Sequence, residues 1–151
     1  MGTIYQHVSG GGEQVIGRVD SENGSVYSAR FGAEKYVGRV DYAQGYVYSH
    51  RGGPDKNIGW VDVENGKIYD NQFGDDHYMG QVDADGKLYQ HVPLLPDIEL
   101  GYVDDLHNVV EGAAALLLLF ADEATIEQED QVTSNDLPGL SLNPGLAGAA
   151  A

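Results

Sequence analysis

The chain has 151 residues, no cysteine and a formal net charge of −16, from 8 basic and 24 acidic side chains. This acidity argues against binding to nucleic acid or to anionic membranes, because both attract Lys and Arg. The lack of cysteine excludes disulfides and thiolate metal ligands. A chain of this length is large enough for one domain with a buried core.

The first residues show no signal-peptide pattern, because no basic segment followed by an apolar run opens the chain. The sequence therefore predicts a cytoplasmic protein. The segment 2–5, Gly-Thr-Ile-Tyr, instead matches the second half of a unit that recurs along the chain.

That unit begins with the phrase Gly-x-Val-Asp, which occurs five times at a constant spacing of 21 residues. Its opening glycines are Gly17, Gly38, Gly59, Gly80 and Gly101. Four copies continue to a turn such as Asn23-Gly24 and then to a Val/Ile/Leu-Tyr pair. Alternating apolar residues on both sides of an Asn-Gly turn predict a β-hairpin. A period in this range indicates one hairpin copied in series.

The two ends of the repeat region each carry half a unit. The second half stands at 2–5, and the first half stands at 100–104. If these halves pair, the array closes on itself and leaves no unpaired edge strand. The sequence therefore predicts an all-β fold, a shallow closed barrel of ten strands in which the first and last strands pair.

A run of strong helix formers follows the repeats, from about Val109 to Ala124. About 14 helical residues span only ~21 Å, which excludes a transmembrane span across a core of ~30 Å. A helix that is apolar on all sides must be buried. We expect it to cover or plug the open end of the barrel, and membrane docking or self-association are the alternatives.

The predicted organisation is therefore a barrel with its helix over residues 2–121 and a tail over residues 122–151. The tail is first acidic and then rich in Pro, Gly, Leu and Ala. Such a composition predicts disorder.

Each recurring position of a closed repeat becomes a ring. The valine ring is expected either to pack the core or to line a channel for an apolar ligand. The predicted lining consists of Val19, Val40, Val61, Val82, Val103, Leu116, Leu117 and Phe120. Both strand faces carry apolar residues, so the sequence does not identify which face points into the barrel.

A tyrosine ring is expected to be structural and to cover the opening glycines from the neighbouring strand. Its members are Tyr5, Tyr27, Tyr48, Tyr69 and Tyr89. The sharper alternative is an aromatic cage for a cation.

Two polar rings have alternative interpretations as metal sites. The Asp of each Gly-x-Val-Asp, such as Asp20, is expected to accept hydrogen bonds from its turn, and a hard cation is the alternative. The residues His7, His50 and His91 raise the alternative of a zinc site. Neither alternative is preferred, so the sequence predicts no metal and no cofactor. We find no nucleophile with a base and no phosphate loop, which predicts a protein that is not an enzyme.

The repeat with the apolar run after Gly112 resembles the bacterial β-flower family over residues 2–121. This resemblance implies a shallow, nearly symmetric barrel around an apolar central channel. It implies binding or transport of an apolar molecule, and it carries over no catalytic residue. The segment 59–69, with the one Trp of the chain, is similar to the hairpin repeats of cell-wall-binding proteins that cage choline.

Together these observations predict a non-catalytic binding module that holds a hydrophobic small molecule, lipid or acyl chain in its centre. One alternative is a structural or protein-interaction domain with a packed core, whose partner the sequence does not identify. The other is a choline-type or cell-wall-type binding repeat. A central cavity separates the first from the second, because a packed core leaves no room for a ligand.

Overall fold

The computed structural model describes residues 2–30, 32–51, 53–72 and 74–120. Its first compact unit ends at Leu119, close to the predicted boundary at 121. The predicted tail, residues 122–151, lies outside the described residues.

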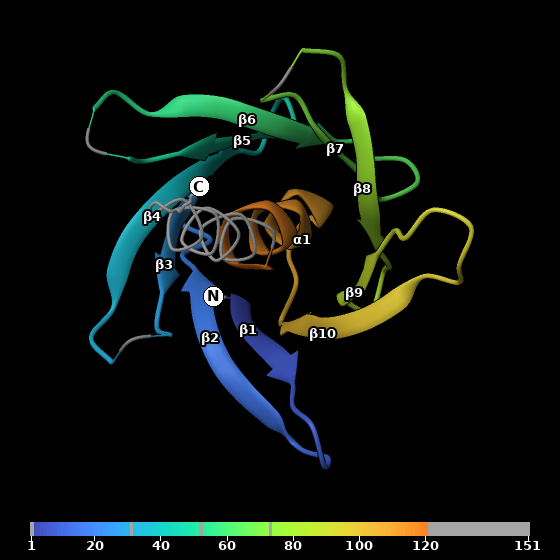
Figure 1. Ribbon diagram of the computed structural model, residues 1–151. Coiled ribbons are helices and arrows are strands. Elements are labelled where there is room, and N and C mark those ends of the chain that lie inside the picture. The colour runs from blue at the N-terminus through green and yellow to red at the C-terminus, as the bar shows by residue number, and fades with distance from the viewer. Residues whose placement is uncertain (1, 31, 52, 73, 121–151) are drawn as a thin grey trace, which may run out of the picture. The chain divides into compact units, whose positions relative to one another are not determined.

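Ten antiparallel strands form a closed barrel, which confirms the predicted fold (Figure 1). The half units at the two ends pair as expected, with Ile4 opposite Val103. The strands are β1 (Gly2–His7), β2 (Glu13–Val19), β3 (Ser25–Ser28), β4 (Lys35–Asp41), β5 (Tyr46–Ser49), β6 (Lys56–Val61), β7 (Lys67–Asp70), β8 (His77–Val82), β9 (Lys87–Gln90) and β10 (Ile98–Asp104).

Two kinds of connection alternate around the barrel. Tight turns join β2 to β3, β4 to β5, β6 to β7 and β8 to β9, and their glycines have a positive φ, as at Gly24 (77°) and Gly66 (75°). The Asp before the turn accepts turn N–H groups as predicted, for example Glu22 N on Asp20 Oδ1 at 3.0 Å. The longer connections, here called the outer loops, join β1 to β2, β3 to β4, β5 to β6, β7 to β8 and β9 to β10. They point away from the centre in Figure 1.

A β-bulge precedes the opening glycine in every copy of the repeat. Between β1 and β2, Ile4 pairs with Gly17 and Tyr5 pairs with Val15, so Ile16 has no partner. The same residue of each copy is skipped, namely Ile16, Val37, Ile58, Met79 and Leu100. A bulge bends and twists its strand. The five bulges therefore curve the sheet where the outer loops turn away from the barrel.

The C-terminal helix lies inside the ring of strands (Figure 1). Its described part comprises the α-helix α1 (Val109–Ala114) and the π-helix η1 (Ala115–Phe120), and the rest of the predicted run up to Ala124 lies outside the described residues. Its residues from Ala113 to Leu119 are at most 3% exposed. The helix is therefore the central part of the core.

We predict that Gly59→Ala strongly destabilises the barrel. A Cβ at this position would collide with the carbonyl oxygen of Tyr69 and lie 2.7 Å from Leu117 Cδ1. Overpacking of this kind costs about 1–3 kcal/mol or more. The control is Gly53→Ala in an outer loop, where a Cβ meets nothing within 4 Å. Chemical denaturation of both variants checks the prediction, and equal midpoints would contradict it.

Candidate functional site

Seven of the eight predicted channel positions lie in the interior of the barrel. The five valines are at most 5% exposed, and Leu116 and Leu117 are each 2% exposed. Phe120, at the end of η1, is half-buried. The sequence analysis missed a second interior ring, in the residue before each Tyr, although the alternation with Tyr was its signal. That ring consists of Ile4, Val26, Val47, Ile68 and Leu88, all fully buried.

Four consecutive leucines of η1 each face the opening glycine of a different repeat. A Cβ built on Gly17 would lie 2.7 Å from Leu119 Cδ1, and one on Gly38 would lie 2.8 Å from Leu118 Cδ1. The series continues with Leu117 at Gly59 and Leu116 at Gly80. One step along the helix thus moves the contact by one repeat around the barrel. The glycines make room for the leucines, which occupy the predicted channel.

The π-helical form suits this arrangement. Five repeats in a ring are about 72° apart, whereas successive residues of an α-helix are about 100° apart. A π-helix closes its hydrogen bonds over five residues instead of four, so it turns less at each residue. The wider helix therefore keeps successive leucines closer to the spacing of the repeats.

A buried carboxylate fixes the start of the helix at the end of the barrel that carries the tight turns. Glu111 is fully buried, and its Oε2 accepts hydrogen bonds from Tyr42 Oη at 2.5 Å and Ser21 Oγ at 3.0 Å. Its Oε1 accepts the backbone N–H of His107 at 2.9 Å. Burial and the bond to Glu111 raise the pKa of Tyr42 well above its usual range. The network ties the helix to the first two tight turns.

The described part of the helix has further polar partners. At the start, Asn108 Oδ1 accepts the N–H of Val110 at 2.9 Å, which is a normal N-cap. Near the last described residues, Arg30 Nη2 donates to the carbonyl of Leu119 at 3.3 Å, and its Nη1 donates to Gln6 at 3.0 Å. These contacts set the position of the helix along the barrel axis.

Ser21 and His107 have the residue types of a nucleophile and a base, but Ser21 donates its hydrogen bond to the buried Glu111. His107 Nδ1 lies 3.2 Å from Ser21 Oγ and 3.1 Å from the carbonyl oxygen of Asp105. Nδ1 of His107 therefore lies within hydrogen-bond distance of two oxygens, and one of them, the carbonyl, can only accept. The hydroxyl proton of Ser21 goes to Glu111. The pair is part of the helix anchor.

The three histidines of the alternative zinc site are not brought together. Each member contacts a separate carboxylate, with His7 to Glu99 at 2.6 Å and His50 to Asp55 at 2.8 Å. His91 lies 3.5 Å from Asp97. Within the described part of the chain, no cluster of three or more His, Cys, Asp or Glu side chains is arranged to hold a metal ion.

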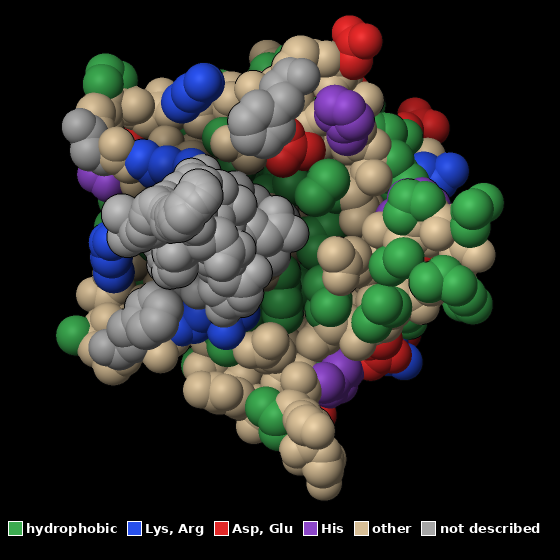
Figure 2. Space-filling model, in the orientation of Figure 1, with side chains coloured by type: hydrophobic (Ala, Val, Ile, Leu, Met, Phe, Trp, Pro, Cys, Tyr) green, Lys and Arg blue, Asp and Glu red, His purple; other side chains and the backbone are tan. Residues whose placement is uncertain are grey.

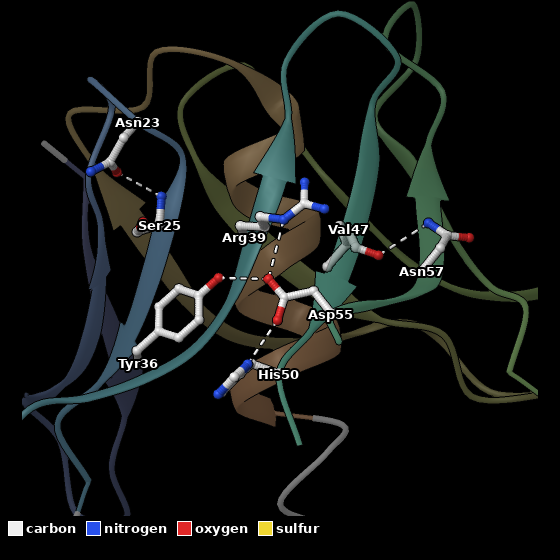
Figure 3. A network of polar contacts seen from close by, with 8 residues as sticks. All are labelled: Asn23, Ser25, Tyr36, Arg39, Val47, His50, Asp55 and Asn57. Atoms are coloured by element: carbon white, nitrogen blue, oxygen red, sulfur yellow. Dashed lines mark hydrogen bonds and ion pairs between the residues drawn. The ribbon is translucent and has the colours of Figure 1, made fainter. Parts of the chain in front are cut away.

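Asp55 is the centre of the richest of these polar contacts (Figure 3). Its Oδ1 contacts His50 Nδ1, while its Oδ2 accepts Tyr36 Oη at 2.9 Å and Arg39 Nε at 3.2 Å. The bonds from His50 and Tyr36 hold the pKa of Asp55 below its usual range. Burial and the same carboxylate raise the pKa of Tyr36 to about 12. The arrangement connects β4 to the outer loop between β5 and β6.

The tyrosine ring is half-buried, but its partners differ from the prediction. Tyr27 lies opposite Arg18 and not opposite Gly17, whose partner is Ser28. The residue opposite each Tyr is the variable one of Gly-x-Val-Asp. The pairing of β2 with β3 is shifted by one residue from the expected register, so that Ser28 and not Tyr27 lies opposite Gly17. A shift of one residue changes the partner of every residue in the strand. In the third copy this residue is Trp60, which stacks on Tyr69 with 4.4 Å between the ring centroids.

A surface groove lies beside Trp60, between the third hairpin repeat and its neighbours. It has a volume of about 740 Å³ and an open mouth. Its described lining comprises Ala43, Gln44, Tyr46, Tyr48, Asn57, Trp60, Val61, Asp62, Val63, Asn71 and Asp76. Three aromatic rings and two carboxylates thus meet here. Asp76 was missed by the sequence analysis, although it follows Trp60 by the 16 residues that also separate Arg18 from Glu34.

A second surface feature is the apolar outer loop between β9 and β10. Leu94 is fully exposed, and Leu95 and Ile98 are 63% and 49% exposed. Figure 2 shows hydrophobic side chains gathered on this side of the molecule. Leu94 also has a φ of 66°, a conformation that side chains other than Gly seldom adopt. Clustered exposed apolar side chains mark surfaces of interaction.

Comparison with known proteins finds no matching family model, no matching curated protein and no matching solved structure. Among the described residues, no helix combines the length and the apolar character that crossing a bilayer requires. The functional interpretation therefore depends on the geometry of this chain.

We predict that Tyr42→Phe weakens the helix anchor. At neutral pH the loss of a donor to buried Glu111 costs about 1–3 kcal/mol. A folded-state pKa above the unfolded value of about 10 means that stability falls as pH rises past that value. The variant lacks this titration, so it should lose less stability than the parent between about pH 9 and pH 11.

The control for this prediction is Tyr46→Phe, because Tyr46 is 39% exposed. Denaturant titrations of the parent and both variants across this pH range provide the measurement. A Tyr42→Phe variant with the stability and alkaline slope of the parent would show that the contact with Glu111 does not anchor the helix.

Proposed function

We propose that this protein is a non-catalytic interaction and binding module. In this proposal the centre of its barrel is a packed core, and its outer surface meets ligands and partners. The single observation that carries the proposal is the contact of Leu116 to Leu119 with four opening glycines, which fills the place where a channel ligand would sit.

Two surface features support a role for the outside of the barrel. The groove beside Trp60 combines concave shape, aromatic faces and carboxylates, which is the usual make-up of a small-molecule site. The outer loop with Leu94 and Leu95 presents apolar side chains to solvent. The absence of catalysis is part of the proposal, because the hydroxyl of Ser21 beside His107 donates to the buried Glu111.

The competing proposal keeps an apolar small molecule or acyl chain in the centre. Such a ligand must take the place of the η1 leucines, because these side chains contact the barrel wall directly. The interior wall would suit it, since both interior rings are apolar. The two proposals therefore differ on whether the helix is part of the stable fold.

We predict that Leu117→Ala and Leu118→Ala each lower the free energy of unfolding by about 2–5 kcal/mol, as expected for buried leucines in a packed core. Leu94→Ala is the matched control, because the same atoms are removed from a fully exposed side chain. Its effect should stay within about 0.5 kcal/mol.

Native mass spectrometry of the purified parent protein, followed by organic extraction, completes the test. We expect the mass of the bare chain and no apolar molecule in the extract. A stoichiometric apolar molecule, together with small effects of both core variants, would favour the central binding site and overturn the proposed packed core.

A further inference from the structure

The repeats place a cation, a Tyr ring and a carboxylate together on the outer surface. In the first copy, Arg18 lies over the ring of Tyr27, with Cζ 4.2 Å from its centroid. Arg18 also donates to both oxygens of Glu34, from Nε at 2.7 Å and from Nη2 at 3.1 Å. The guanidinium is therefore held between an aromatic face and an acid.

The second copy repeats this arrangement 21 residues later. Arg39 lies over Tyr48 at 4.0 Å, and its Nε donates to Asp55 at 3.2 Å. Arg39 and Asp55 are separated by 16 residues, as Arg18 and Glu34 are. The arrangement thus recurs in both copies: the guanidinium forms an ion pair with the carboxylate that follows it by 16 residues in the sequence.

The third copy keeps the acid but has no guanidinium. Trp60 stands where Arg is expected and stacks on Tyr69 at 4.4 Å, while its Nε1 donates to Asp76 at 3.1 Å. An indole N–H is a neutral donor, so it leaves the charge of Asp76 uncompensated. Within the described part of the chain, no Lys, Arg or His forms an ion pair with Asp76.

The groove lies at the place where the cation is missing. Tyr46 lies opposite Trp60 on the adjoining strand, and Asp62 adds a second carboxylate to the lining. Tyr48 also lines the groove, and Arg39 covers one face of its ring. None of the described residues that line the groove is Lys, Arg or His. Its volume of about 740 Å³ is within the range of small-molecule sites. Its shape and charge both favour a small organic cation.

We propose that this groove binds the guanidinium group of a small molecule, between the aromatic faces of Trp60 and its neighbours and the carboxylate of Asp76. The inference rests on the proposed role of the outer surface and names the ligand class of that surface. A planar guanidinium stacks on aromatic rings and forms forked hydrogen bonds to a carboxylate, as Arg18 does with Glu34. A tetraalkylammonium ion has the charge but no N–H to donate, so it should bind more weakly.

The single Trp of the chain makes the site directly observable. Titration of the intact protein with millimolar methylguanidinium should change the fluorescence of Trp60 and saturate. Urea is the neutral planar control and should give no saturable change at the same concentrations. Tetramethylammonium should bind about tenfold more weakly, a factor that corresponds to about 1.4 kcal/mol.

Two variants test the roles of the acid and of the missing cation. Asp76→Asn keeps an acceptor for the indole but removes the charge, and we expect about tenfold weaker binding, or about 1.4 kcal/mol. Glu34→Gln removes the equivalent acid of the first copy and should leave the affinity unchanged. Trp60→Arg restores the pattern of the first two copies, so calorimetry should detect no binding of methylguanidinium to a protein that remains folded.

Binding of urea as strong as that of methylguanidinium, equal affinity for the Asp76→Asn variant, or no saturable change at all would overturn the inference. A blocked arginine tripeptide that binds more than tenfold tighter would place the guanidinium on a partner chain and overturn the small-molecule assignment. The core variants Leu117→Ala and Leu118→Ala test the proposed function separately, because their stability does not depend on the groove.

Discussion

The close contact between bare glycine backbone and leucine side chains is the constraint on which the rest of the structure depends. At Gly38 a Cβ would collide with the carbonyl oxygen of Tyr48 and crowd Leu118, so neither the neighbouring strand nor the helix tolerates a larger residue. The period of 21 residues places such a glycine in each of the first four copies. The barrel and the π-helix therefore specify each other. A helix of a different pitch would direct its leucines between the glycines and against the wall.

Apolar packing alone does not fix where a helix sits along a smooth apolar wall, because the hydrophobic effect has no direction. The polar contacts of the described part of the helix supply that information. Glu111 binds two tight turns at its start, and Arg30 binds the carbonyl of Leu119 near the last described residues. A buried carboxylate without partners would be strongly unfavourable, so slippage of the helix breaks several hydrogen bonds together. The leucines can therefore stay in register with the repeats.

The repeat predicted the strands, the turns and the closure of the barrel, because each depends on local patterns and on the two half units at the ends. It did not predict the bulges, since an extra residue such as Ile16 looks like ordinary alternation until the pairing partner is known. It could not predict a π-helix, because an unbroken apolar run has no periodicity to measure. The contact of Trp60 with Asp76 was missed since it joins a strand to an outer loop, and only the folded chain brings these together.

Repetition also explains how a site can arise on such a protein without any change to its core. The interior positions must stay nearly identical among the copies, because their glycines and valines are packed closely against the same buried helix. The variable residue of Gly-x-Val-Asp faces outward, where Arg, Trp, Gln and Tyr are all present among the five copies. Where this residue is Arg, the acid of the same copy is already neutralised. The third copy, which has Trp in place of Arg, keeps the strand pairing of the others, leaves its acid without an ion pair among the described residues and adds an aromatic face. A single substitution between copies, Trp60 in the place of Arg, therefore replaces an internal ion pair by the site at which we propose that a cation binds.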